Sequence, residues 1–307
     1  MDENTVINWL LEGDAAVRWQ VHRDLLSSSE EKVREERKRI ENSGWGLKIL
    51  SFQGRNDIWD GLGKIGWRSA MYNLQLLRRL GLLPGIPRIN TACQIMLDKG
   101  LHSDGGIQYE DTKSEMCQTA MSMAIFAYFQ IQDERLEQII SYIISNQLDD
   151  GGWNCRHPRV KTNHSSFNTT FHVLEALQQI KQNLPEYFSS YDISGKLSEG
   201  IEFLLQHRLY KSHTTGEIAD SQFTNISFPP RHKYDIMSGL DFLQSINHPT
   251  DERCSDAVNL IKRRQKQGKW PMGIYHQGLS FFKIEDGRQP SRMNTLRGLR
   301  IVKWWHQ

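Results

Sequence analysis

Apolar residues recur at helical spacing in segments that begin about fifty residues apart along the chain. Three segments align so that Ser69, Thr119 and Thr169 fall in register, each followed by apolar residues at three- and four-residue spacing. A repeat of this length fixes an architecture, because each copy adds one structural unit. We expect helices of one kind, called inner helices below, in five segments: Gly66–Leu80, Glu115–Phe129, Ser165–Ile180, His232–Ile246 and Ser291–Trp305.

A second kind of segment lies between these helices and is more amphipathic. Its apolar residues fall on one face and its charged residues on the other, as in a helix with one side in water. We expect outer helices with this pattern in four segments: Arg88–Leu101, Glu134–Leu148, Lys196–Leu209 and Cys254–Gly268.

Glycine-containing turns separate the two kinds of helix, in strings such as SDGGIQY, LDDGGWN and KQGKWPMG. Glycine supplies the positive φ that ends a helix, and Asp before Gly favours a tight turn. One period is therefore an outer helix, a glycine turn and an inner helix. With a further helix expected over residues 9–26, about six hairpins account for nearly the whole chain.

This series predicts an all-α fold, and we expect one α/α toroid over residues 1–307 with the inner helices around a central cavity. An open solenoid of the same hairpins is the structural alternative. The stretch 210–228 is longer than an ordinary helical connection and lacks a helical period. It is therefore either a lid over the cavity or a surface insertion.

Charge and composition narrow the classes of partner. The 38 basic and 36 acidic residues nearly cancel and form no long block, which argues against nucleic acid. The first residues are acidic rather than a signal peptide's basic start, and no window has the roughly 18 apolar residues that span a bilayer. The four cysteines lie far apart and do not resemble a disulfide scaffold, so we expect a cytoplasmic protein. The expected partner is a small molecule, with no obligate protein partner evident.

The string QLDDGGWN, residues 147–154, resembles the Gln-Trp repeat of squalene-hopene and oxidosqualene cyclases. The hairpins from 59 to 305 are similar to the toroid of prenyltransferases and squalene cyclases, and most closely to short bacterial proteins of squalene-cyclase-like type. The resemblance implies an α/α toroid and an isoprenoid-like substrate. It does not imply a standard polyene cyclisation, because the Asp-x-Asp-Asp acid motif of class II terpene cyclases does not occur in this sequence.

Protein prenyltransferase β subunits bind zinc through an Asp-x-Cys pair at the start of one inner helix and a His from a later one. The matching place reads SEMCQTA, so the resemblance assigns Glu115 and Cys117 to the pair and leaves the third ligand to Asn168 or His164. Zinc is the one cofactor that we consider, with Cys117 and Cys155 as its thiolate donors. The alternative is that Glu115 caps the helix and Cys117 fills a core site.

The string FPPRHKYD, residues 228–235, gathers reactive groups at the first turn of an inner helix. His232 can act as an acid or a base near neutral pH, with Asp235 to orient it and Tyr234 as a proton donor. Arg231 precedes them as a substrate-binding group. The alternative is structural, with Asp235 as a first-turn charge and Arg231 as its surface partner.

Further polar side chains are expected at the cavity from neighbouring helix starts and turns. His164 and Asn168 stand at the start of one inner helix, and Asn154 stands in the turn before it. At the start of the last inner helix, Arg292 could bind a carboxylate or phosphate through two hydrogen bonds, beside Asn294. Arg292 could equally be a surface residue.

Aromatic residues recur at or near the glycine turns, at Trp59, Trp67, Tyr109, Trp153 and Trp270. In the resembling cyclases this position packs one repeat against the next. Rings that face the cavity instead would stack on a substrate or stabilise a cationic intermediate. Trp67, Tyr109, Trp153 and Trp270 are therefore candidate substrate-binding residues.

Taken together, these residues predict an enzyme whose cavity lies at the starts of the inner helices. The residues expected to carry acid–base chemistry are Glu115, His232, Tyr234 and Asp235. Their substrate would be small or isoprenoid-like, and only the resemblance supplies the isoprenoid part. Two alternatives stay open: a carbohydrate-active hydrolase or lyase that uses Glu115 and Asp235 as its carboxylate pair, and a toroid that binds a ligand without catalysis.

Overall fold

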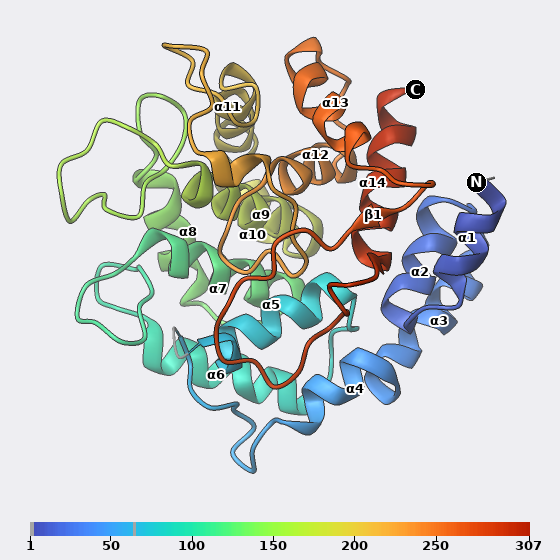
Figure 1. Ribbon diagram of the computed structural model, residues 1–307. Coiled ribbons are helices and arrows are strands. Elements are labelled where there is room, and N and C mark those ends of the chain that lie inside the picture. Colours follow the sequence, from blue (N-terminus) through green and yellow to red (C-terminus); the bar gives the residue numbers. More distant parts are fainter. Residues whose placement is uncertain (1–2, 64–65) are drawn as a thin grey trace.

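The inner helices that the apolar periodicity predicts form a ring around a common centre. The computed structural model describes residues 3–63 and 66–307, and within these residues six helices make up the ring (Figure 1). They are α2 (Ala15–Asp24), α5 (Ala70–Leu80), α7 (Met116–Tyr128), α9 (Phe167–Asn183), α12 (Ile236–Ser245) and α14 (Arg292–Trp305). Each predicted inner segment overlaps one of these helices, and α9 continues beyond its predicted end at Ile180 to Asn183.

Contacts between neighbours close the ring. Helix α7 packs along α5 and α9, and α14 packs against both α12 and α2. The rings of Phe171 on α9 and Phe242 on α12 lie 6.1 Å apart. The last junction is made by Trp19 on α2, whose indole N–H donates to the carbonyl of Leu80 at the end of α5 at 2.8 Å. This closure confirms the all-α toroid and rules out the open solenoid.

A second layer of helices surrounds the ring. Six of its helices each come before one inner helix in the chain: α1 (Glu3–Leu11), α4 (Gly44–Ser51), α6 (Pro87–Gly100), α8 (Leu136–Ser145), α11 (Ile193–Gln206) and α13 (Ser255–Arg263). Two more, α3 (Glu30–Asn42) and α10 (Pro185–Ser190), fill the spaces between them. Helix α13 illustrates the predicted amphipathic pattern, since it buries Ala257, Val258 and Ile261 and ends in basic residues. Burial of such faces against the inner helices produces one continuous apolar core.

The N-terminal segment differs from its prediction. The helix expected over residues 9–26 is two helices, α1 and α2, separated at Gly13 and Asp14. The side chain of Asp14 accepts a hydrogen bond from the backbone of Ala16 at 2.9 Å and so starts a new helix. Gly13 packs against the first residue of α14, because a Cβ on Gly13 would fall 2.6 Å from Cδ of Arg292.

Tryptophan side chains tie each turn to the outer helix before it. The indole N–H groups of Trp59, Trp153 and Trp270 each donate to a carbonyl near the end of that helix. The acceptors are the carbonyl oxygens of Ile49, Ile143 and Ile261, at 3.0, 2.7 and 2.8 Å. A buried indole needs such a partner, so the repeated tryptophan fixes the angle between outer helix and turn.

Threonine hydroxyls tie the same turns to the inner helices. The backbone N–H groups of Ile107, Trp153 and Trp270 donate to Oγ1 of Thr119, Thr170 and Thr295, at 2.8, 2.9 and 3.0 Å. The structural equivalent of Thr119 is therefore Thr170, one residue beyond the Thr169 of the sequence alignment. The glycines of the turns have φ values that favour glycine, 87° at both Gly105 and Gly151.

Two long connections lie at the N-terminal ends of the inner helices. The first is the stretch 272–289 between the short strands β1 (Trp270–Pro271) and β2 (Pro290–Ser291), which pair antiparallel. It crosses the face of the ring in Figure 1, drawn in red, and we call it the crossing loop. The second runs from α11 to α12 and contains a 3₁₀ turn, Ser221–Thr224.

The stretch 210–228 has two parts. Lys211 and Ile218 form an isolated antiparallel bridge, and the tip that they enclose is exposed. The second part contributes Ile226 and Phe228 to the core, with 0% and 3% of their surfaces exposed. The exposed part is therefore a surface hairpin, whereas the buried part is held in place by packing.

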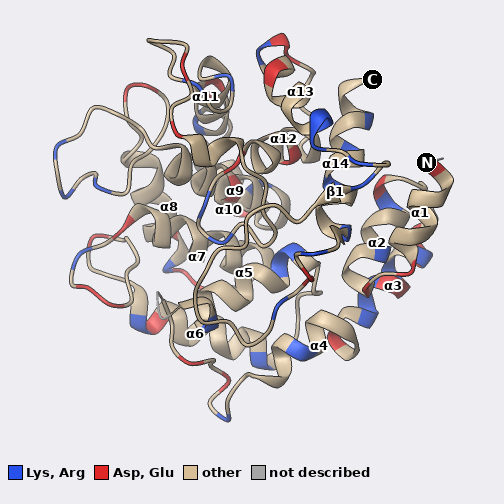
Figure 2. Ribbon diagram, in the orientation of Figure 1, with Lys and Arg blue, Asp and Glu red and all other residues tan. Residues whose placement is uncertain are grey.

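In the part of the chain that the structure describes, no helix is both long enough and apolar enough to cross a membrane. Basic and acidic residues are interspersed along the helices of both layers (Figure 2). The short 3₁₀ turns Gly66–Arg68 and Glu252–Cys254 lie in connections and leave the ring unchanged. The candidate site lies at one end of this ring.

Candidate functional site

Four side chains meet where the inner helices begin, and we call them the mouth cluster: Trp67, Tyr72, Arg231 and His232. The hydroxyl of Tyr72 lies 3.1 Å from Nδ1 of His232. The ring of Trp67 meets Tyr72 edge-on at 4.8 Å, and the guanidinium of Arg231 lies 4.9 Å from the centre of the Trp67 ring. Tyr72 is buried and the other three are half-buried. Of the sequence candidates, the structure brings Trp67, Arg231 and His232 together here.

The environment of Tyr72 favours its neutral form. Burial raises the pKa of its hydroxyl, and the nearby carboxylates of Glu115 and Glu110 raise it further, whereas Arg231 lowers it. Burial also lowers the pKa of Arg231. Tyr72 therefore keeps its proton at neutral pH, and the tautomer of His232 decides which of the two groups donates in this contact.

Two carboxylates and two amides line the same end of the ring. The amide nitrogen of Gln118 on α7 donates to Glu115 Oε2 at 3.2 Å and approaches Glu110 Oε2 at 3.3 Å. Gln108 donates to Glu115 Oε2 at 3.2 Å as well. Glu115 precedes α7 directly and is half-buried. The sequence predicted an acidic group at this helix start, and the Glu115 carboxylate there is close enough to raise the pKa of Tyr72.

The crossing loop lies on the mouth cluster. The backbone N–H of Trp67 donates to the carbonyl of Leu279 at 2.8 Å, and its indole N–H donates to the carbonyl of Gln277 at 3.0 Å. His276 Nε2 lies 3.2 Å from the hydroxyl of Ser227. The segment bonded to the mouth cluster is therefore 272–289, whereas the sequence considered only 210–228, as a lid or a surface insertion. Neither Tyr72 nor His276 was a sequence candidate, because Tyr72 reads as one more core residue of a helix.

Tyr234 and Asp235, which the sequence predicts to be catalytic, both make hydrogen bonds within the fold. Tyr234 is 2% exposed and its hydroxyl donates to the carbonyl of Leu209 at 2.8 Å. Asp235 is the N-cap of α12, accepting from the backbone of Ser238 at 2.8 Å and from the hydroxyl of Ser227 at 3.0 Å. Oδ1 thus caps the helix and Oδ2 is bonded to a neighbouring side chain. The structural alternative from the sequence, a first-turn charge at Asp235 with Arg231 as its partner, differs from this arrangement, because the Arg231 guanidinium lies over the Trp67 ring.

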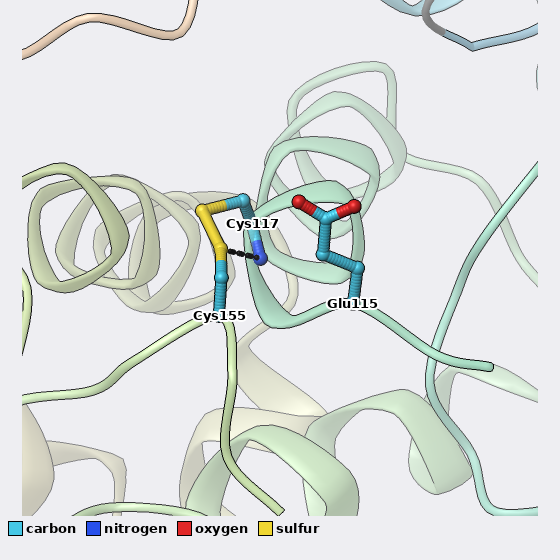
Figure 3. A group of neighbouring side chains, drawn as sticks. All are labelled: Glu115, Cys117 and Cys155. Carbon is cyan, nitrogen blue, oxygen red and sulfur yellow. Dashed lines mark hydrogen bonds between the residues drawn. A yellow bond between two sulfur atoms is a disulfide. The ribbon is translucent and has the colours of Figure 1, made fainter. Parts of the chain in front are cut away.

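The zinc prediction is not supported. Glu115, Cys117 and Cys155 do place their donor atoms within 4.8 Å of one another, but the two sulfurs are joined in a disulfide (Figure 3). A disulfide offers no thiolate to a metal. This bond also corrects the expectation that the cysteines are unpaired, which holds only for Cys93 and Cys254, both buried.

The residues expected around the start of α9 are partly used by the fold. The side chain of Asn168 accepts a hydrogen bond from the backbone of Tyr234 at 2.7 Å and so links α9 to α12. Asn154 donates to the carbonyl of His164 at 2.7 Å, which closes the turn between them. The His164 side chain is exposed. These contacts give Asn154 and Asn168 a positioning role at the ring's edge.

Several aromatic and polar candidates lie within the packing between hairpins. Trp153 and Trp270 have no exposed surface, and the Tyr109 hydroxyl lies 2.7 Å from the hydroxyl of Ser122. Asn294 is also fully buried and donates to the carbonyl of Met272 at 3.0 Å. These positions fit the packing alternative that the sequence left open for the three aromatic residues. Asn294, which the sequence predicts to bind substrate, makes its hydrogen bonds within the fold.

Arg292 lies at the junction of the chain ends and not in the mouth cluster. Its Nε donates to the carbonyl of Trp9 at 3.0 Å, and its guanidinium lies 4.6 Å from the centre of that tryptophan ring. The contact joins α14 to α1. The sequence offered an anion contact or a surface position for Arg292, and the structure gives it a cation–π contact with Trp9 and places it 3.9 Å from the Glu12 carboxylate.

No protein-family model matches the chain, and no curated protein matches it. Among solved structures, the chain is similar over its full length, and over the full length of the other chain, to a protein from Actinoplanes, at 12% identity and a TM-score of 0.51. Two structures of the type II terpene cyclase MstE from Scytonema, one of them in complex with geranylgeranyl dihydroxybenzoate, are 14% identical to it. They cover 87% of this chain, and 79% and 78% of theirs, at a TM-score of 0.46. At these identities the first similarity shows the fold alone.

Proposed function

We propose that the protein is an enzyme that moves a proton on a small, mainly apolar substrate at the mouth cluster. The observation that carries this proposal is the contact between the Tyr72 hydroxyl and Nδ1 of His232, 3.1 Å apart beside the ring of Trp67. An imidazole that is oriented by a second group is the usual form of a general acid or base.

His232 is the catalytic residue in this proposal, and Tyr72 is its positioning residue. Tyr72 orients the imidazole through Nδ1, and the imidazole of His232 exchanges a proton with the substrate. A proton that leaves one carbon while another is added elsewhere gives an isomer of the substrate, so no further reactant is consumed. The rings of Trp67 and Tyr72 provide apolar surface for an alkene, and a ring face turned to the substrate would stabilise a cationic intermediate.

The substrate class follows from the neighbours of the pair. Aromatic rings supply apolar surface, and the guanidinium of Arg231 supplies a positive charge for a carboxylate or a diphosphate. An isoprenoid that bears such a group has both properties, which agrees with the cyclase-like repeat of the sequence. The crossing loop must move for the substrate to enter, because it is bonded to Trp67.

Proton exchange in D₂O tests this function even where the product has not been identified. The protein is incubated with isoprenoid alcohols, acids and diphosphates, and deuterium uptake is followed by mass spectrometry. We expect uptake in at least one compound and a loss of about 100-fold or more in His232→Gln. The matched control is His306→Gln, since His306 is exposed at the C-terminal end of α14, away from the cluster. Exchange at the wild-type rate in His232→Gln, or no exchange with any compound, contradicts the proposal.

A further inference from the structure

A second site lies at the opposite end of the ring, where the inner helices end. A cavity of about 590 Å³ opens there and is lined by residues of α2, α3, α5, α9, α12 and α14 and by Tyr128 at the end of α7. It reaches inward to Phe171, Ser238 and Arg297, which lie in the first halves of α9, α12 and α14. Its volume is in the range of small-molecule pockets. No residue of the mouth cluster lines it, so it is separate from the proposed proton-transfer site.

The lining carries more positive than negative charge. Among the described residues, the guanidinium groups that line the cavity belong to Arg23, Arg37, Arg78, Arg79, Arg297 and Arg300. The carboxylates are those of Asp24, Glu175 and Asp241, which leaves an excess of three positive charges, six minus three. The partial negative charge of the helix ends offsets part of this excess. Such a lining favours an anion.

The arginines are held in place before any ligand arrives. Arg78 Nη2 lies 3.0 Å from Glu175 Oε1, and both Arg297 and Arg300 bond to Asp241, at 3.2 and 2.7 Å to its Oδ2. Only 5% of the Arg297 side chain is exposed. Because the guanidinium planes are fixed by these bonds, an anion would bind without the cost of ordering them.

Arg79 is the residue with hydrogen-bond donors to spare. Within the described part of the chain it makes one hydrogen bond, from Nη2 to Glu175 Oε2 at 2.8 Å, which leaves its Nε and Nη1 without a protein acceptor. Burial lowers the pKa of Arg79, Glu175 raises it, and the positive charges of Arg78 and Arg297 lower it further. An anion beside Arg79 would use both donors and relieve the repulsion.

The neutral part of the lining indicates a hydrophilic ligand. Amide side chains supply much of it, from Gln178, Gln179, Gln182, Asn183 and Gln244. Amides donate and accept hydrogen bonds at once, which suits hydroxyl groups and does not suit a hydrocarbon chain. A phosphate carries up to two charges and several acceptor oxygens, which matches the charge excess better than a single carboxylate does.

We propose that this cavity binds a small phosphate ester of a polyol, of the sugar phosphate type, with the phosphate at Arg79 and the hydroxyl groups on the amides. The ligand differs from the apolar substrate of the mouth cluster. The site therefore gives the toroid a second, hydrophilic ligand at the end opposite its proposed chemistry.

Calorimetric titration of the whole protein tests the site with ribose 5-phosphate, inorganic phosphate and ribose as probes. We expect ribose 5-phosphate to bind, inorganic phosphate to bind more weakly and ribose not to bind. In Arg79→Gln the affinity for ribose 5-phosphate falls about tenfold or more, and in Arg79→Lys it falls less, because the charge stays but the fork of donors is lost. The control Arg55→Gln, at an exposed arginine outside the cavity, binds as the wild type does.

The other outcomes decide against the site or against its ligand class. No binding of either phosphate at millimolar concentration, or equal binding by Arg79→Gln and the wild type, overturns the site. Inorganic phosphate that binds as tightly as the ester overturns the polyol part. Circular dichroism checks that the Arg79 variants are folded, and His232→Gln should bind the ester unchanged, since the two sites are separate.

Discussion

The hydroxyl of Tyr72 lies 3.1 Å from Nδ1 of His232, although 160 residues separate them along the chain. Tyr72 belongs to α5, and His232 lies just before α12, across the ring from it. Only a closed toroid brings these two helix starts together. The contact is therefore a product of ring closure as well as a candidate for chemistry.

Removal of the Tyr72 hydroxyl should separate these two roles. In Tyr72→Phe we expect a loss of about 1 kcal/mol in the free energy of unfolding, the net value of one hydrogen bond. The His232 imidazole also loses its partner at Nδ1, so its tautomer balance should change. Chemical denaturation measures the first effect and nitrogen NMR of the imidazole measures the second. Tyr191→Phe, at a half-buried tyrosine of the outer layer, is the control, and an unchanged His232 spectrum in Tyr72→Phe would refute the contact.

The contacts of the crossing loop with the mouth cluster should become less stable in mild acid. Burial lowers the pKa of His276 from its ordinary value of 6.5, with Lys233 and Arg231 lowering it as well and Asp235 opposing them. The released loop thus binds a proton more readily than the bound loop does, so the bound state is most stable above pH 6.5 and loses stability as the pH falls below it.

Hydrogen exchange measures this effect at the backbone amide of Trp67, which donates to Leu279. After correction for the intrinsic pH dependence of exchange, its protection should fall between pH 7 and pH 5.5. The amide of Trp270, bonded to Thr295, is the internal reference. In His276→Gln the fall should disappear, and a fall of the same size in that variant would assign it to another group.

Glu175 neutralises the two adjacent arginines of the hydrophilic cavity, and its replacement should be costly. In Glu175→Gln, Arg78 and Arg79 lose their common carboxylate, and we expect a loss of about 3–5 kcal/mol in the free energy of unfolding. Glu199→Gln is the matched control, because the ion pair of Glu199 with Lys196 is exposed and should contribute about 0.5 kcal/mol or less.

The same carboxylate should make stability depend on pH in acid. Burial opposes ionisation of Glu175, but Arg79 and Arg78 hold its pKa well below the ordinary 4.5. A lowered pKa stabilises the folded state above pH 4.5, and this contribution is lost as the pH falls towards the folded-state value. Urea denaturation between pH 6 and pH 3 should show a smaller pH dependence in Glu175→Gln than in the wild type. Equal slopes would mean that other carboxylates account for it.

The helices were predictable because their apolar periodicity and their turn glycines are local features. Trp153 illustrates this, since its place in the repeat follows from the sequence and its hydrogen bond to Ile143 spans only ten residues. The division between α1 and α2 was missed because a glycine within a helical pattern is often tolerated, and only Asp14 as an N-cap reveals the break.

The candidate site was predictable in part. His232 and Arg231 could be identified because proline and reactive residue types mark their helix start. Tyr72 could not, since a tyrosine at an apolar position of a helix gives no sign of a partner on a distant helix. The arginines of the hydrophilic cavity were missed for a related reason. Arg78 and Arg297 read as separate charges on two distant helices until the ring brings them together.

The sequence suggested that Cys117 and Cys155 lie close together as zinc ligands. They do lie close together, but in the structure their sulfurs form a disulfide. The disulfide closes a loop of sequence separation 38, for which chain entropy predicts a stabilisation of about 4 kcal/mol. A Cys117→Ser/Cys155→Ser double variant should lose up to this amount, and reduction of the wild type should lower its denaturation midpoint to a similar value. The reductant should have little effect on the double variant.

Alkylation in denaturant without reductant identifies the bond directly. We expect mass spectrometry to find Cys93 and Cys254 alkylated and Cys117 and Cys155 protected, because the first two are free thiols that unfolding exposes. If all four cysteines react, the disulfide is absent, and metal analysis of the same sample then decides between free thiols and a bound ion. Stoichiometric zinc that is lost in the double variant would restore the ligand set that the sequence suggested, since Glu115 lies within reach of both sulfurs.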